Sequence, residues 1–437
     1  MDRKTTRRTF LRASGTAAGI GLSAGLLGGR AHAAPSDRVN LGLVGVGPMG
    51  GGHLRRYLGF PDVRVAAICD VNRRKLDGAV ASTKGSAAGY RDFRQLLEHK
   101  DLDAVVVAPP PHWHAIVAVA ACKAGKDVFI EKPMTLTVGE SRAVCKAVKD
   151  HARISQVGTQ IHAGENYARV VEIVRSGILG KISCVRTFMN LDQTRKGIGT
   201  ADDRPPPEFL DWDMWVGPAP MRPYNPLITK GAYHHCSFMA FSGGWLPGMA
   251  PHIIDLPVWA LELGLPVQTS ASGGRFVIED SGDCPDVQEV LWQYPGLVMT
   301  HMMNLTNSYG WDFRGTGGRK RRLGIYFHGE KATLFCDYGT FTIVPEDDPK
   351  AELTLPDKTL PRSKGHYREW IDCIKTRQQP SCNVFYHHKV NVPCCLANLS
   401  LKLGRSIRLD PKTETAVGDD EANRAFTPTY RQPWTLG

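Results

Sequence analysis

VNLGLVGVGPMG, residues 39–50, joins a short apolar run to a glycine-rich turn. The run from Val39 to Val44 is typical of a buried strand, and the segment after the turn can be helical. Gly45, Gly47 and Gly50 have the G-x-G-x-x-G spacing with which a backbone approaches a pyrophosphate at the N-terminus of a helix. The glycines could also serve only a tight turn, but the flanking strand and helix favour a dinucleotide-binding unit.

The alternation of strands and helices continues from this stretch to Val157. A helix is expected from His114 to Ala124, and the capping-box pair Thr137 and Glu140 opens another. Apolar runs predict further strands at residues 63–69, 104–108, 127–130 and 154–157. Repeated β-α-β units predict a parallel sheet that is covered by helices on both faces.

After about Gly158 the pattern changes to that of a different domain. A helix pattern over residues 166–176 leads into a long strand candidate, residues 181–190, and then into a polar, proline-rich stretch, residues 200–226. Later strands come in pairs around short turns, at residues 287–294 with 297–304 and at residues 324–328 with 332–336. Helices are expected near residues 366–376 and 392–404.

The expected fold class is α/β, with two domains. We predict an N-terminal Rossmann domain at residues 37–157, built on a doubly wound parallel sheet. We predict a substrate and oligomerisation domain of α+β type at residues 158–376, with an open, mostly antiparallel sheet. Residues 377–437 are expected to form a helical segment and a tail that packs back on both domains.

Asp70 stands at the end of the second predicted strand, where a carboxylate can accept hydrogen bonds from ribose hydroxyls. The same charge would repel a 2′-phosphate, which favours NAD over NADP. Arg74 leaves NADP open, since an arginine there could stack on adenine or meet a phosphate.

Glu131-Lys132-Pro133 follows a later strand of the same predicted sheet. Ligands of such folds bind at the carboxyl ends of the strands, so Lys132 is a candidate acid/base rather than an ordinary surface lysine. Beside a cationic nicotinamide and partly buried, its pKa is expected to fall toward working pH.

These motifs resemble the glucose–fructose oxidoreductase/inositol dehydrogenase (Gfo/Idh/MocA) family over nearly the whole chain after the leader. The resemblance also rests on residues 158–160, 212–218 and 366–411. It implies hydride transfer between NAD(P) and a sugar or cyclitol carbinol, with Lys132 in proton transfer. The expected cofactor contacts are Gly45, Gly47, Pro48, Met49, Gly50, Asp70, Arg74, Pro109, His112, Trp113, His114, Glu131 and Lys132.

The family's second motif, G-G-x-x-x-D-x-G-x-H-x-x-D, matches residues 243–255 only in part. His252 matches its histidine and Asp255 its last aspartate, whereas Gly248 replaces the earlier aspartate. In the family, the replaced aspartate and the histidine contact the substrate carbinol, so the glycine puts ordinary sugar dehydrogenase activity in doubt. His252 could still share the proton work with Lys132, or it could be a buried histidine at a helix start.

Further polar side chains could form hydrogen bonds with sugar hydroxyls, and aromatic side chains could stack on a sugar face. The expected substrate contacts are Gln160, His162, Tyr233, His235, Trp245 and Asp255, with His234, Trp311 and Asp312 as looser candidates. The histidines at positions 234, 235 and 252 could suggest a metal, but no carboxylate or cysteine stands at a fitting spacing, and no metal is expected.

The first residues look like a leader. Arg7-Arg8-Thr9-Phe10-Leu11 is a twin-arginine pattern, a small apolar stretch follows, and Ala31-His32-Ala33 fits a cleavage site. The apolar run is rich in glycine and short for a membrane span, so a retained anchor is the weaker alternative. We expect residues 1–33 to engage the twin-arginine export machinery, leaving a periplasmic protein without a stable membrane anchor.

Composition excludes some partner classes. The formal charge of the chain is +11, and the leader, with six basic residues and one acidic residue, accounts for +5 of it. The basic residues from Arg319 to Arg322 form a single short cluster, so nucleic-acid binding is not expected. Eleven cysteines are an odd number, and folding before export takes place in a reducing compartment, so free thiols are favoured.

Three functions are compatible with these features. The first is a periplasmic NAD(P)-dependent oxidoreductase for a sugar, sugar derivative or cyclitol, for which we expect a tightly bound nucleotide and a homodimer or homotetramer as the assembly. The second is a redox-neutral glycosidase or lyase, which oxidises its sugar only transiently and so needs no free nicotinamide outside the cytoplasm. The third is a non-enzymatic sugar or nucleotide sensor, against which the intact Glu131-Lys132-Pro133 argues.

Overall fold

The computed structural model describes residues 38–193, 197–309 and 322–436, which belong to one compact unit, Asp37–Gly437. The expected leader lies outside the described residues, as do Trp311 and Asp312. Among the helices that are described, none combines the length and apolar character needed to cross a membrane.

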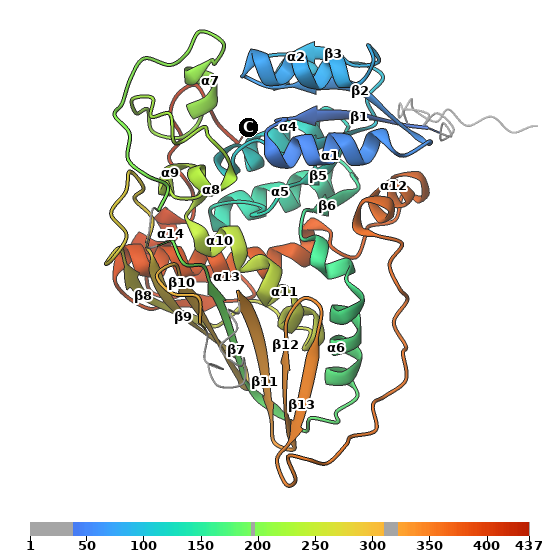
Figure 1. Cartoon of the computed structure of the whole chain (residues 1–437), viewed down its shortest axis with the longest axis vertical. Coiled ribbons are helices and arrows are strands. Elements are labelled where there is room, and N and C mark those ends of the chain that lie inside the picture. Colours follow the sequence, from blue (N-terminus) through green and yellow to red (C-terminus); the bar gives the residue numbers. More distant parts are fainter. Residues whose placement is uncertain (1–37, 194–196, 310–321, 437) are drawn as a thin grey trace, which may run out of the picture. The chain divides into compact units, whose positions relative to one another are not determined.

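A six-stranded parallel sheet forms the N-terminal part, as expected (Figure 1). Its strand order is β3-β2-β1-β4-β5-β6. Successive strands are added on one side of β1 and then, from β4, on the other, and this switch leaves a crevice at the carboxyl ends of β1 and β4. Its strands are β1 (Val39–Val44), β2 (Val63–Cys69), β3 (Ala88–Tyr90), β4 (Ala104–Val107), β5 (Asp127–Ile130) and β6 (Ser155–Val157). The connecting helices are α1 (Pro48–Leu58), α2 (Arg73–Ser82), α3 (Phe93–Leu97), η2 (Pro111–Trp113), α4 (His114–Lys123) and α5 (Val138–Asp150).

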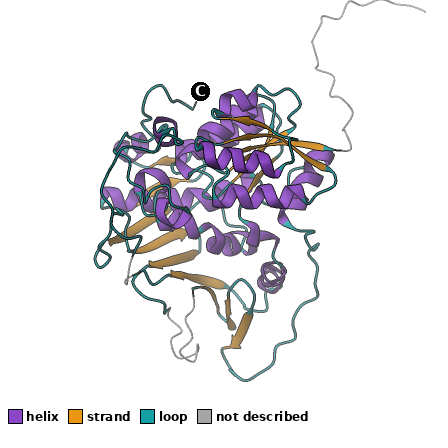
Figure 2. Cartoon of the chain, turned by 45° about the horizontal axis from the view of Figure 1, so that its top comes forward, coloured by secondary structure: helices purple, strands orange, loops and turns teal. Residues whose placement is uncertain are grey.

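A nine-stranded mixed sheet forms the second part, and most of its pairs are antiparallel (Figure 2). Its order is β13-β12-β11-β7-β10-β9-β8-β14-β15, and β10 pairs with β7 in parallel at its centre. The strands are β7 (Ile182–Asn190), β8 (Gln268–Gly274), β9 (Val287–Tyr294), β10 (Leu297–Asn304), β11 (Leu323–Gly329), β12 (Ala332–Cys336), β13 (Phe341–Pro345), β14 (Ile407–Asp410) and β15 (Thr415–Ala416).

Helices pack against one face of this second sheet. Trp292 and Met299 of the sheet share a core with Ile253 of α11 and Val390 of α13. The opposite face carries partly exposed apolar side chains, among them Leu291 and Val344. The remaining helices are η3 (Gln160–Ala163), α6 (Glu165–Arg175), α7 (Trp212–Val216), α8 (Ala232–His235), α9 (Met239–Ser242), α10 (Trp245–Met249), α11 (Pro251–Ala260), α12 (His366–Thr376), α13 (Val384–Leu403) and α14 (Asp420–Ala425).

The sequence predicted ten of the fifteen described strands, and the helices α4, α6 and α12, to within one or two residues, and Thr137 and Glu140 form the expected capping box. The short helices of the second domain and the strands β3, β8, β13, β14 and β15 were not predicted. The start of α13 was predicted wrongly. The helix begins at Val384, capped by the Asn383 side chain, and runs through Pro393 rather than starting beside it. Burial between the two sheets outweighs the helix-breaking tendency of the proline, whose carbonyl accepts a 2.9 Å hydrogen bond from Trp292 Nε1.

Candidate active site

The glycine-rich turn between β1 and α1 has no room for a side chain at Gly45 or at Gly50, whereas the Cβ position of Gly47 is open. Gly45 has φ +82°, and a Cβ atom there would lie 2.6 Å from the backbone nitrogen of Pro109. A Cβ atom on Gly50 would lie 1.8 Å from the carbonyl oxygen of Gly45. Pro48 begins α1 after Gly47, so the N-terminus of the helix opens directly onto this turn. The turn therefore has the close backbone packing and helix end that a pyrophosphate needs.

Asp70 follows the last residue of β2 and lines the same crevice. Its two carboxylate oxygens accept 2.8 Å hydrogen bonds from the amides of Val46 and Asn72. Burial raises the pKa of Asp70, and these two amides offset part of that rise. The carboxylate thus joins the glycine turn to the loop after β2, where the ribose of a nucleotide would lie.

The Arg74 guanidinium stacks 4.0 Å from the ring centre of Phe209 rather than lining the crevice. The cations that do line it beside Asp70 are Lys75 and Arg91, which the sequence analysis did not single out.

One cavity connects the glycine turn to residues of the second domain. Its lining includes Asp70, Lys132, His235 and Gly248. From the cofactor side come also Gly45, Gly47, Pro48, Met49, Pro109, Trp113, His114 and Glu131, and from the second domain Leu210, Met214, Trp215, Thr229, Cys236 and Ser242. Most of the predicted cofactor contacts and one predicted substrate contact, His235, thus line a single cavity.

Glu131 and Lys132 follow β5 into this cavity. Glu131 Oε1 bonds His53 Nε2 at 2.9 Å, and its Oε2 accepts from the Lys132 amide at 3.0 Å. Burial alone would raise the pKa of Glu131, but the His53 bond and the neighbouring Lys132 charge bring it to about 2. The carboxylate is therefore ionised, and it holds the loop whose Lys132-Pro133 bond is cis.

Some of the predicted cofactor contacts in the loop after β4 line the cavity, and others lie outside it. His114 lines the cavity, but its ring nitrogens lie 2.7 Å from the Pro133 carbonyl and 2.9 Å from the Pro109 carbonyl. His112 is buried outside the lining, between the carbonyls of Trp215 and Phe241. Burial lowers the pKa of His112 to about 4. Its contacts join the two domains instead of reaching a cofactor.

Lys132 meets the second domain at the position where the motif lacks its aspartate. Its Nζ donates a 3.1 Å hydrogen bond to the carbonyl oxygen of Gly248, in α10. His252 lies one turn further on, in α11, buried and outside the cavity lining. Burial and the Lys132 charge lower the pKa of His252, and its Nδ1 has no hydrogen-bond partner among the described residues.

Asp255 belongs to a buried cluster behind that position. Its carboxylate lies 3.0 Å from His162 Nδ1 and accepts a 2.7 Å hydrogen bond from the Tyr386 hydroxyl. Burial alone would lower the pKa of His162, but Asp255 raises it. Cys382 also lies within reach, so these three side chains could surround an ion, a grouping that the sequence spacing did not reveal. Because His162 and Tyr386 already satisfy the carboxylate, the cluster is complete as a hydrogen-bonded unit.

The other predicted substrate contacts are spread around the cavity. His235 lines it, whereas Gln160, Tyr233 and Trp245 do not. Gln160 is exposed, and Tyr233 is half-exposed against Trp245, at 5.2 Å between ring centres. Trp245 is buried and donates through Nε1 to Ser237 Oγ at 3.3 Å. Of the three histidines considered for a metal, only His235 faces the cavity.

Comparison with known proteins agrees with this geometry. Residues 39–159 match an oxidoreductase family with an NAD-binding Rossmann fold, and residues 164–267 and 305–436 match the C-terminal alpha/beta domain of that family. The chain belongs to the Gfo/Idh/MocA oxidoreductase family. The resemblance found in the sequence is thereby confirmed.

Curated members of the Gfo/Idh/MocA family match shorter parts of the chain. A glycosyl hydrolase family 109 protein of Shewanella pealeana is 32% identical over 211 residues, which are 41% of this chain and 44% of that protein. An inositol 2-dehydrogenase of Salmonella paratyphi B is 34% identical over 142 residues, 32% of this chain and 42% of that protein. The matches therefore span less than half the length of either relative.

Solved structures of similar fold cover more of the chain. Levoglucosan dehydrogenase in complex with NADH and levoglucosan has a TM-score of 0.62 at 18% identity, covering 85% of this chain and 99% of that one. An oxidoreductase domain protein from Kribbella flavida has a TM-score of 0.65 at 19% identity, covering 85% and 99%. At such identities the likeness shows the fold alone.

The Gfo/Idh/MocA chain has a cavity that fits its family's cofactor. A Cβ atom would collide at Gly45 and Gly50, the end of α1 faces the turn, and Asp70 stands where a ribose would lie. The fit is to NAD, which would supply a hydride acceptor when bound.

A segment of the second domain crosses the cofactor end of the cavity. This segment, residues 207–217, is called the strap. Asn72 and Leu210 form an antiparallel bridge, and the Asp211 amide donates to the Val71 carbonyl at 3.1 Å. At its other end, Arg431 of the tail donates to the Gly217 carbonyl at 2.9 Å. Sequence periodicity did not indicate these contacts, because they join segments that are distant in the chain.

Proposed function

We propose that this protein is an NAD-dependent oxidoreductase that acts on a carbinol of a sugar, sugar derivative or cyclitol. The observation that carries the proposal is the position of Lys132. Its side chain lines the same cavity as the glycine turn and donates to the carbonyl of Gly248, and among the described residues it forms no ion pair with a carboxylate. A cation there can orient a hydroxyl and stabilise the negative charge that develops on its oxygen.

The cavity lining also suits a sugar. Trp215 offers a flat apolar surface, while Thr229, Ser242 and His235 offer hydrogen-bonding groups. Inositol 2-dehydrogenase among the relatives and levoglucosan dehydrogenase among the similar structures carry names of the same substrate class.

The test begins with the purified protein without added nucleotide. Its absorbance near the reduced-nicotinamide band, about 340 nm, and the nucleotide released on denaturation show what is bound. Inositol, levoglucosan and a panel of sugars and glycosides are then added with and without NAD. Reduction of NAD in proportion to oxidised sugar supports the proposal, and the absence of any turnover in the panel contradicts it and favours a sensor.

A redox-neutral cleavage is the second candidate, and the strap favours it. Bridged to the loop after β2 and held by Arg431, the strap covers the nucleotide end of the cavity and would slow exchange. A retained nucleotide must be restored within each cycle, as in the transient oxidation used by nicotinamide-dependent glycosidases. The glycosyl hydrolase family 109 relatives support the same reading. Accumulation of a cleaved glycoside without net reduction of NAD would establish it.

We also propose that residues 1–33 direct the folded protein through the twin-arginine machinery to the periplasm. Changing Arg7 and Arg8 to lysine should retain a fused reporter in the cytoplasm.

The partly exposed sheet face that carries Leu291 and Val344 supports a homodimer or homotetramer. Light scattering of the protein and of Leu291→Lys tests this assembly, which the charge should weaken.

A further inference from the structure

We propose that His235 is the group that accepts the proton of the substrate hydroxyl, with Lys132 as the hydrogen-bond donor to the same oxygen. The inference rests on the proposed function and adds to it a residue that the family motif does not contain. It starts from the four imidazoles of this region, which differ in what their nitrogens can do.

Two of the four imidazoles are occupied by backbone carbonyls. Both ring nitrogens of His112 lie within hydrogen-bond distance of carbonyls, as do both of His114. His252 is buried, and it is absent from the lining of the cavity. Among the described residues, His235 is thus the histidine that lines the cavity without two carbonyls on its ring.

His235 is neutral under ordinary conditions. Burial, with His112, His114 and Lys132 nearby, lowers the pKa of His235 to about 3. The Gly231 carbonyl opposes this fall by interacting with the ring. An N–H held by that carbonyl would leave the other nitrogen with a lone pair that can accept the substrate proton. The low pKa makes the ring a weak base, so it would hold that proton only transiently.

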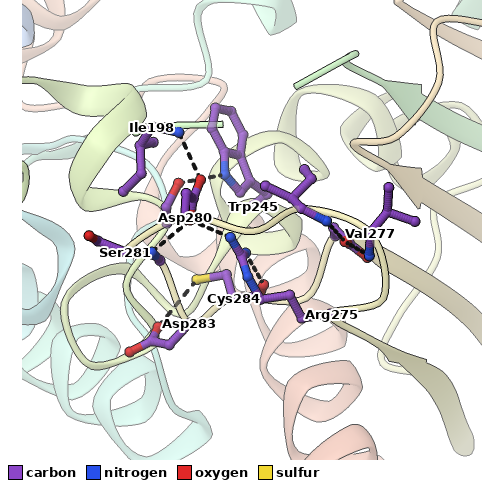
Figure 3. Close-up of polar contacts among 12 residues, drawn as sticks. Ile198, Trp245, Arg275, Val277, Asp280, Ser281, Asp283 and Cys284 are labelled. Atoms are coloured by element: carbon purple, nitrogen blue, oxygen red, sulfur yellow. Dashed lines mark hydrogen bonds and ion pairs between the residues drawn. The ribbon is translucent and has the colours of Figure 1, made fainter. Parts of the chain in front are cut away.

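Hydrogen bonds from residues 283 and 284 hold the segment that follows His235. Cys284 Sγ contacts the Cys236 carbonyl at 3.3 Å, and the amide of Asp283 donates to the Ser237 carbonyl at 2.9 Å. Asp280 anchors this supporting loop by accepting from the Ile198 amide and from Arg275, as Figure 3 shows. Such support suits a side chain that must keep one orientation.

Gly248 lines the cavity together with Lys132 and His235. A Cβ atom on Gly248 would lie 3.8 Å from Cys236 Sγ, an ordinary contact, so the cavity has open space beside Gly248. The Lys132 charge acts on the His235 ring in this cavity. Among the described residues, the hydrogen bond of Lys132 Nζ is to the Gly248 carbonyl, and a lysine side chain there can donate further hydrogen bonds. A substrate hydroxyl that binds beside Gly248 would donate to His235 and accept from Lys132.

In the oxidation direction, the O–H proton passes to His235 while the hydride of the same carbon leaves to bound NAD. The carbinol becomes a carbonyl, and the imidazolium later releases its proton to solvent. In the reverse direction His235 returns the proton to the oxygen.

The test compares His235→Gln, His252→Gln and the neighbour control His234→Gln, using the fastest substrate of the panel above. His234 is outside the cavity lining. We expect His235→Gln to lower kcat by about 10²- to 10⁴-fold, with NADH affinity and melting temperature unchanged and with little effect from His234→Gln. Two repairs probe chemistry rather than folding: added imidazole should restore His235→Gly, and Gly248→Asp should partly restore His235→Gln by supplying a carboxylate.

Retention of kcat within a few-fold in His235→Gln, with loss in His252→Gln, would overturn the inference and leave the proposed function standing. Loss of kcat in His235→Gln with no repair by imidazole or by Gly248→Asp would reduce His235 to a structural role and also overturn it. A wild-type protein that binds NADH but oxidises and cleaves nothing in the panel would overturn both.

Discussion

Asn72 and Leu210 form an antiparallel backbone bridge that joins the parallel sheet to the second domain across the nucleotide end of the cavity. Arg74 reinforces the bridge by stacking on Phe209 at 4.0 Å. A segment from the domain that would bind the substrate therefore lines the cofactor end of the cavity.

Phe209→Ala should speed the release of nucleotide. It removes the surface on which Arg74 stacks, an interaction of about 0.5–1 kcal/mol at exposed sites, so the dissociation rate of NADH should rise about two- to fivefold. Stopped-flow displacement of bound NADH measures this rate. Phe276→Ala, at an exposed phenylalanine outside the cavity lining, is the control, and equal rates in all three proteins would show that the strap does not limit release.

Gly50→Ala should weaken nucleotide binding. Its methyl group would lie 1.8 Å from the Gly45 carbonyl oxygen, so the turn must open. Gly52→Ala is a matched control in the same helix, because nothing lies within 4 Å of its Cβ position. We expect NADH affinity to fall at least about tenfold, roughly 1.4 kcal/mol, in the first variant only. Fluorescence titration measures both, and equal affinities would contradict the pyrophosphate assignment.

Lys132→Met should lower turnover by about 10²- to 10⁴-fold while NADH still binds. The change removes the cation at the substrate oxygen but keeps the length and apolar stem of the side chain. Steady-state rates and NADH titration separate the two effects, with the exposed Lys123→Met as control. Unchanged turnover would remove Lys132 from the mechanism.

Asp70 should make the protein prefer NAD to NADP. Its carboxylate would repel a 2′-phosphate, while Lys75 and Arg91 at the same end of the cavity could receive one. The wild type should bind NADH more tightly than NADPH, and Asp70→Ser should narrow or reverse that ratio. Parallel titrations measure it. Comparable affinities in the wild type would contradict the role given to Asp70.

His162 should stabilise the fold most at low pH. Its pKa is raised in the folded state by Asp255, so its contribution is complete below its unfolded pKa of about 6.5 and is lost as pH rises through the folded value. The melting temperatures of wild type and His162→Gln should therefore differ most near about pH 5 and converge toward about pH 9. A difference that does not change with pH would show that the His162–Asp255 contact is not an ion pair.

The sequence predicted ten of the fifteen described strands because their signals are local. The glycine spacing after Val44, the capping box at Thr137 and the paired strands around Gly296 each depend on neighbours in the chain. Helix α13 was misplaced because the proline signal at Pro393 is local, whereas the burial that overrides it is not.

The residues of the candidate site also fall into those that the sequence predicted and those that only the structure placed. By itself, the sequence determined the glycine turn, Asp70 and the Glu131-Lys132-Pro133 loop, since each lies next to a strand end and parallel strands bring their carboxyl ends together. Only the tertiary structure decided that His235 faces the cavity while His112 joins the domains and Asp255 lies in a buried cluster. The direction of a side chain in a loop or short helix depends on contacts with backbone that is distant in the sequence. Such contacts leave no periodic pattern in the sequence.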